Sequence, residues 1–274
     1  MSKKTVLTEY SLSLPKIKEP FDLALVSDLH ERRADDILML LKKAKPDLIA
    51  IAGDTFERID ENDERRGVTK RGIISQAFFR TAYLFNFFMI HVLSKKDLPE
   101  TENAYNFLAE AAKLAPVYLS LGNHEDKLDD EDIDALEKNG VVLLDNADCC
   151  ARIKGNLLRI GGLSSCPDEQ WLKRFSQGVG FKLLLCHHPE YYDSMAAGCD
   201  IDLVLAGHNH GGQMRLFGRG VFSSRSGLFP KYDKGVFDDR LVVSAGCSNT
   251  VALPRLFNPC ELVVIHIKPQ NNFK

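Results

Sequence analysis

The chain has 274 residues, of which 45% are hydrophobic and 27% are charged, so it is long enough for one large α/β domain or two smaller ones. These fractions are typical of a globular protein. The formal net charge of −3 provides no overall positive field, so we expect no nonspecific binding of nucleic acid.

The first nine residues carry a short basic run with no apolar stretch behind it, so we expect no secretory signal and a location in the cytoplasm. The seven cysteines are odd in number and show no C-x-x-C spacing. Such cysteines are typical of reduced thiols and favour neither a disulfide framework nor a zinc ribbon.

Five short apolar runs along the chain each end abruptly at residues that can bind a metal ion. They are 21–26 before Asp28 and His30, 48–52 before Asp54, 117–121 before Asn123 and His124, 183–186 before His187, and 203–206 before His208 and His210. Runs of this length and composition predict buried strands.

The segment between the first two runs predicts a helix. Residues 34–45 place apolar side chains on one helical face, and Pro46 ends the pattern. A strand, helix, strand unit implies parallel strands, and ligands in open α/β sheets bind beyond the carboxyl ends of such strands. We therefore expect the five runs to deliver their terminal residues to one place. Further helices are predicted at 101–114, 129–139 and 168–177, a hairpin at 149–161, and late strands at 241–245 and 262–267.

A charged and Phe-rich segment at about 57–99 departs from this regularity, and we interpret it as a helical insertion in a single domain covering residues 1–274. Its apolar part, 73–93, has an uncharged stretch shorter than the roughly 20 residues of a membrane span. One hypothesis is a helix packed on the domain or in a dimer interface. The other is a lid or membrane-facing platform, which would place the protein at the inner face of the membrane.

Taken singly, each of these polar residues has an ordinary explanation in structural hydrogen bonding. Together they form an ordered set that reads D-x-H, G-D, G-N-H-E, H-x-P and G-H-x-H. Oxygen and imidazole donors without thiolates suit Mn, Fe or Zn better than Ca or softer metals.

This set resembles the calcineurin-like metallophosphoesterase superfamily over most of the chain, from Asp28 to His210. The resemblance implies an α/β sandwich of two mixed β-sheets flanked by helices, with the metal site at the carboxyl ends of the strands. The run 211–213, Gly246 and the segment 254–255 are similar to a bacterial branch with small membrane-related phosphodiesterases and UDP-diacylglucosamine pyrophosphohydrolases.

The resemblance also implies a site with two divalent ions and a role for each of its residues. The first ion would be held by Asp28, His30 and His210, the second by Asn123, His187 and His208, and both by Asp54, with His124 beside them as the catalytic acid. Glu125 would support these residues, and Arg32 is a candidate for contact with the substrate phosphate. The expected reaction is attack of a metal-bound hydroxide on a phosphodiester, phosphomonoester or pyrophosphate.

The expected partner is a small-molecule, nucleotide-linked or lipid-linked phosphate ester, with membrane contact through 73–93 as one hypothesis and the oligomeric state left open. Two other functions compete with this one. A scaffold of the same fold would have lost ligands, whereas the full set is present here. A nuclease is disfavoured by the acidic balance and by the lack of a clustered Lys/Arg face.

Overall fold

The computed structural model describes residues 5–58, 100–125, 127–223, 226–249 and 255–270. Its centre is a pair of six-stranded mixed sheets. In spatial order the first sheet contains β1 (Val6–Leu14), β16 (Glu261–Pro269), β2 (Phe21–Val26), β3 (Leu48–Ala52), β4 (Val117–Ser120) and β5 (Val142–Leu144). The second contains β14 (Gly235–Phe237), β15 (Leu241–Val243), β9 (Leu203–Ala206), β8 (Phe181–Cys186), β7 (Asn156–Leu163) and β6 (Ala147–Ile153).

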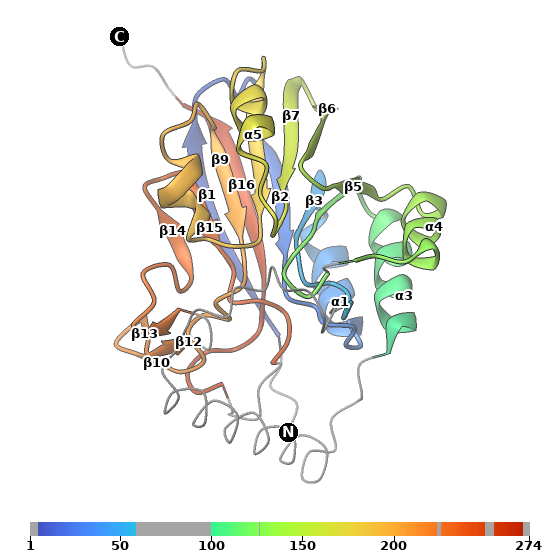
Figure 1. Ribbon diagram of the computed structural model, residues 1–274, viewed down its shortest axis with the longest axis vertical. Coiled ribbons are helices and arrows are strands. Elements are labelled where there is room, and N and C mark those ends of the chain that lie inside the picture. Colours follow the sequence, from blue (N-terminus) through green and yellow to red (C-terminus); the bar gives the residue numbers. More distant parts are fainter. Residues whose placement is uncertain (1–4, 59–99, 126, 224–225, 250–254, 271–274) are drawn as a thin grey trace.

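Helices cover the outer faces of this sandwich. Figure 1 shows α1 (Asp35–Ala44), α3 (Thr101–Ala112) and α4 (Asp130–Lys138) together on one side, and α5 (Glu169–Ser176) near β7 and β9. A short π-helical turn, η2 (Tyr192–Ala196), follows β8. Asp129 and Asp132 form a capping box at the start of α4, which satisfies backbone N–H groups that the helix leaves without partners.

Alternation along the strands explains how one chain builds three apolar layers. In β2 and β3, Leu23, Leu25 and Leu48 face the core between the two sheets, while Val26 and Ile49 pack under the helices. Burial on both faces accounts for the continuous apolar runs in the sequence. In the second sheet, the other face of β8 and β9 packs against α5 and η2.

The predicted fold class is confirmed, and the five predicted strands are β2, β3, β4, β8 and β9. The four predicted helices, the hairpin β6–β7 and the late strands β15 and β16 also form, with ends displaced by a few residues. The long first strand β1 was not predicted. It pairs in parallel with β16 along its whole length, so its position depends on a partner about 250 residues away, Val6 facing Glu261.

After β9 the chain builds two short hairpins before entering β14, at one end of the molecule in Figure 1. They consist of β10 (Arg215–Leu216) with β11 (Arg219–Gly220), and β12 (Phe222–Ser223) with β13 (Gly227–Leu228). We call residues 214–223 and 226–232 the hairpin loops.

The insertion predicted at about 57–99 lies almost entirely outside the described residues, as does the apolar stretch 73–93. Its helical character, the lid and platform hypotheses, and the single-domain boundaries therefore stay predictions. Within the described part of the chain, no helix is long and apolar enough to cross a membrane.

Candidate metal centre

The candidate ligands meet where strands of both sheets end. Strands β2, β3 and β4 are parallel neighbours in the first sheet, and β8 and β9 are parallel neighbours in the second. Parallel neighbours bring their carboxyl ends to the same edge of a sheet. Donor atoms within 4.8 Å of one another define one group of Asp28, His30 and His210, and another of Asp28, Asp54 and His187.

Asp54 lies between the two groups of imidazoles. Its Oδ2 atom is 3.1 Å from Nε2 of His187 and 3.7 Å from Nε2 of His30. His187 Nε2 is also 3.1 Å from Nδ1 of His208, and Nε2 of His210 is 3.6 Å from Oδ1 of Asp28. One carboxylate thus faces both groups of imidazoles.

Hydrogen bonds across the two sheets fix the orientation of these side chains. The Nδ1–H group of His187 donates to the Ala52 carbonyl oxygen at 2.8 Å, which leaves Nε2 directed at Asp54. The backbone N–H of His208 donates to Oδ1 of Asp28 at 3.1 Å. The backbone N–H of His124 donates to Oδ1 of Asp54 at 2.9 Å.

The loops after the strands adopt an unusual backbone conformation at the ligand positions. Asp28, His30, Asp54 and His208 have φ values of 53°, 51°, 55° and 73°, in the left-handed region that non-glycine residues rarely occupy. Such strain concentrates at functional sites, where surrounding contacts enforce it. Glycine is required beside these residues because a Cβ atom at Gly122 would lie 2.1 Å from Oδ1 of Asp54.

Asn123 occupies the turn between Gly122 and His124, whose backbones both approach Asp54. Glu125 is buried, and its carboxylate accepts backbone N–H bonds from Asp54 at 3.0 Å and Gly122 at 2.7 Å. It therefore joins the loop after β3 to the loop after β4. Burial and the nearby Asp54 charge raise the pKa of Glu125 to about 7, against the effect of these N–H bonds.

Glu57 is a functional candidate that the sequence did not single out. Its carboxylate lies 2.5 Å from Nδ1 of His30 and 2.8 Å from Nδ1 of His124, whose ring centroids are 4.7 Å apart. Burial opposes ionisation, but the hydrogen bonds with His124 and His30 lower the pKa of Glu57 to about 2. The Glu57 carboxylate therefore links His30, a candidate ligand, to His124, the candidate catalytic acid.

Two further residues contact the predicted ligands. Glu190 Oε1 lies 3.9 Å from Nε2 of His208, and Nη2 of Arg255 lies 2.9 Å from Nδ1 of His210. Burial, together with Arg255 and against the pull of Asp28, lowers the pKa of His210 to about 3. A lowered pKa favours the neutral imidazole, the form that binds a metal ion.

The Arg32 side chain binds other residues of the chain near the start of α1. Its guanidinium forms an ion pair with Asp36 at 2.9 Å and donates to the Cys247 carbonyl oxygen at 2.6 Å. Its predicted contact with substrate phosphate is not tested by this arrangement and stays a prediction.

The donor set fits divalent metal ions. It offers carboxylate oxygens and imidazole nitrogens without a thiolate, the donors preferred by Mn, Fe and Zn. Nε2 of His30 is buried and has no hydrogen-bond partner among the described residues. Burial alone would lower the pKa of His187, yet Asp54 and Asp28 raise it to about 10, which shows how strongly these buried carboxylates favour positive charge at this position.

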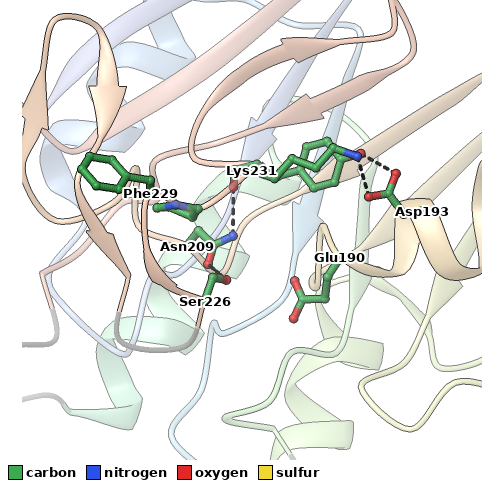
Figure 2. A pocket seen from close by; sticks show the side chains of 8 residues that line it. Glu190, Asp193, Asn209, Ser226, Phe229 and Lys231 are labelled. Carbon is green, nitrogen blue, oxygen red and sulfur yellow. Dashed lines mark hydrogen bonds and ion pairs between the residues drawn. The ribbon is translucent and has the colours of Figure 1, made fainter.

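A cavity of about 200 Å³ adjoins the centre through Glu190. Figure 2 shows Phe229 on one side of it and Glu190 and Asp193 on the other. Asp193 accepts hydrogen bonds from Lys231 at 2.6 Å and from the Tyr232 hydroxyl at 2.7 Å. The cavity wall therefore combines the aromatic ring of Phe229 with the ion-paired Asp193 and the carboxylate of Glu190.

Comparison with known proteins identifies the family. A profile of the calcineurin-like phosphoesterase family matches residues 21–212. An uncharacterized protein of Bacillus subtilis (strain 168), YpbG, is 25% identical over 220 residues, which cover 76% of this chain and 68% of YpbG. The metallophosphoesterase Cj0846 of Campylobacter jejuni is 25% identical over 273 residues, which cover 94% of this chain and 62% of that protein.

A more distant relative is the putative metallophosphoesterase F40B5.2 of Caenorhabditis elegans, 24% identical over 266 residues that cover 89% of this chain and 47% of that protein. The chain thus spans between 47% and 68% of the length of these three relatives. Among solved structures, the phosphopantetheinyl hydrolase PptH of Mycobacterium tuberculosis has a TM-score of 0.39 and 12% identity, covering 70% of this chain and 84% of that chain.

The family match, together with the cluster of oxygen and nitrogen donors, places the chain among metal-dependent hydrolases of phosphoric esters. The family match covers more than half of the 274 residues, and the chain belongs to the calcineurin-like phosphoesterase family.

Proposed function

We propose that the protein is a binuclear phosphoesterase that hydrolyses a small phosphodiester, phosphomonoester or pyrophosphate. The observation that supports this proposal best is the position of Asp54, with one oxygen atom near His30 and near His187. In this assignment Asp28, His30 and His210 hold the first ion. Asn123, His187 and His208 hold the second ion, and Asp54 binds both.

Two divalent ions, Mn, Fe or Zn, would lower the pKa of water and offset negative charge on the attacking and leaving oxygens. The chain fixes the orientation of the candidate ligands, because His187 and Asp28 are held by backbone groups of the opposite sheet. It also supplies a proton donor in His124, which is 21% exposed and therefore accessible from the site opening. Glu57 at Nδ1 of His124 leaves Nε2 to protonate the leaving oxygen.

The cavity beside Glu190 would receive the organic group of the ester. Phe229 offers a flat apolar surface to the cavity, and the Glu190 carboxylate offers hydrogen-bond acceptors. This wall suits an organic group with hydroxyl or amino donors. Its volume of about 200 Å³ suits a small group better than a folded nucleic acid.

The experiment that tests this function combines elemental analysis with turnover of aryl phosphomonoesters and phosphodiesters under Mn, Fe and Zn. We expect about two ions per chain in the natural sequence, and fewer in Asp54→Asn together with loss of turnover. His124→Ala should keep its ions and lose turnover by about 10²–10⁴, with a larger loss for an alkyl than for an aryl leaving group. A chain without bound metal after growth with all three metals, or full turnover in Asp54→Asn, would refute the proposal.

A further inference from the structure

Three Leu-Phe pairs stand out on the surface formed by the chain after β9. The pairs are Leu216-Phe217, Leu228-Phe229 and Leu256-Phe257. Their phenylalanines are 105%, 64% and 80% exposed, and the leucines are exposed as well. The other large exposed hydrophobic residues of the described chain, Val6, Met39, Val142 and Val179, are scattered over separate elements. Large apolar side chains gathered in one exposed region mark an interaction surface.

Backbone hydrogen bonds join the three pairs into one unit. Arg215 donates to the carbonyl oxygen of Leu256 at 3.0 Å, which links the first hairpin to the third pair. Val221 donates to Met214 at 2.8 Å, and Phe229 donates to Val221 at 2.9 Å, which links the two hairpins. The pairs therefore belong to one hydrogen-bonded group of loops rather than to independent loops.

The same loops carry positive charge on a chain whose net charge is −3. The described residues between 214 and 234 include four basic residues, Arg215, Arg219, Lys231 and Lys234, and a single acid, Asp233. Arg215 pairs with that acid at 3.0 Å, and Lys231 and Lys234 pair with Asp193 and Glu261, whereas Arg219 is exposed. Local charge of this sign favours a negatively charged partner.

We propose that this surface, residues 214–223 and 226–232 with Leu256 and Phe257, docks on an anionic lipid membrane. Phenylalanine and leucine at the ends of short loops can enter the headgroup and acyl boundary, while the exposed Arg219 beside them meets anionic headgroups. An anionic lipid surface matches both features at once. Because Phe229 also lines the cavity beside Glu190, docking would hold that cavity against the lipid; on the proposed function, this favours a lipid-linked phosphate ester as substrate.

The test is co-sedimentation of the full chain with vesicles of phosphatidylcholine, with and without phosphatidylglycerol. We expect binding to the anionic vesicles that weakens as salt is raised. The variant Leu216→Ser with Phe217→Ser should bind at least about tenfold more weakly, because two apolar side chains no longer enter the membrane interface. Arg219→Glu should reduce binding to the anionic vesicles in particular.

Met39→Ser and Val179→Ser are matched controls, because these exposed apolar residues lie on α1 and after α5, away from the hairpin loops. Both should bind as the natural sequence does. Hydrolysis of a soluble aryl phosphate should be unchanged in the Leu216 and Phe217 variant, so failure of docking is distinguishable from failure of the proposed activity. Equal vesicle binding by that variant would overturn the proposal. So would sedimentation showing that the variant changes self-association instead, since the surface would then bind a second copy.

Discussion

At the scale of single residues, Glu57 shows how one carboxylate can serve two imidazoles with different tasks. It contacts His30, a candidate ligand, and His124, the candidate acid, through the Nδ1 atom of each ring. Carboxylates in this position fix ring orientation and raise the basicity of the nitrogen that faces the metal or substrate. Glu57 should therefore act as a positioning residue for both.

Glu57→Gln is expected to lower turnover of an aryl phosphodiester by about 10–100-fold, the usual cost of losing such a partner. The change is nearly isosteric, so the thermal unfolding temperature should move little. The pH profile of turnover should change, because Glu57, whose pKa of about 2 keeps it ionised, no longer supplies a negative charge to the site. Glu110→Gln is the matched control, since Glu110 pairs with Lys113 on the surface of α3. An unchanged pH profile in Glu57→Gln would remove the positioning role.

At the scale of elements, the sequence predicted best what depends on local pattern. Strands β3 and β9 are apolar throughout, and β2 and β8 are so except for Asp22 and Lys182, because both faces are buried. Each of the four strands ends within two residues of a candidate ligand. What could not be predicted depends on distant partners. Glu57 looked like the first charge of an insertion, and only the approach of the loops after β2 and β4 reveals its contacts.

Helix α4 illustrates a second element that distant residues hold in place. Its Asp132 side chain is fully buried and accepts from Arg58 Nε at 2.7 Å and from the Tyr105 hydroxyl at 2.8 Å. Arg58 also pairs with Glu31 at 2.8 Å. The group therefore joins α3, α4 and the loop after β2 beside the metal centre.

Asp132→Asn is expected to reduce the free energy of unfolding by about 3 kcal/mol near neutral pH, because it removes one charge of a buried pair. Although burial acts in the opposite direction, Arg58 and Tyr105 lower the pKa of Asp132 below its ordinary value. Its stabilising effect is therefore complete above about pH 4 and is lost as pH falls through the lower folded-state pKa. Denaturant titrations should show the two proteins converging in acid, while the exposed control Asp130→Asn should follow the natural sequence throughout.

At the scale of the whole molecule, the site joins the two sheets of the sandwich. Asp28, His30 and Asp54 follow strands of the first sheet, and His187, His208 and His210 follow strands of the second. The bonds from His187 to Ala52 and from His208 to Asp28 already cross between the sheets. Ions bound by these side chains would connect the same two layers, so metal binding and folding should be coupled.

Removal of metal by a chelator is therefore expected to lower the thermal unfolding temperature, and Mn should restore it. At a free ion concentration about 100 times the dissociation constant, one site stabilises by about 2.7 kcal/mol. For a chain of this size each kcal/mol corresponds to about 2–4 °C, so calorimetry should resolve a shift of several degrees. Asp54→Asn should lose most of the response to Mn, whereas Glu110→Gln should keep it. An equal response in both would mean that the stabilising ions bind elsewhere and that the sheets are not joined through Asp54.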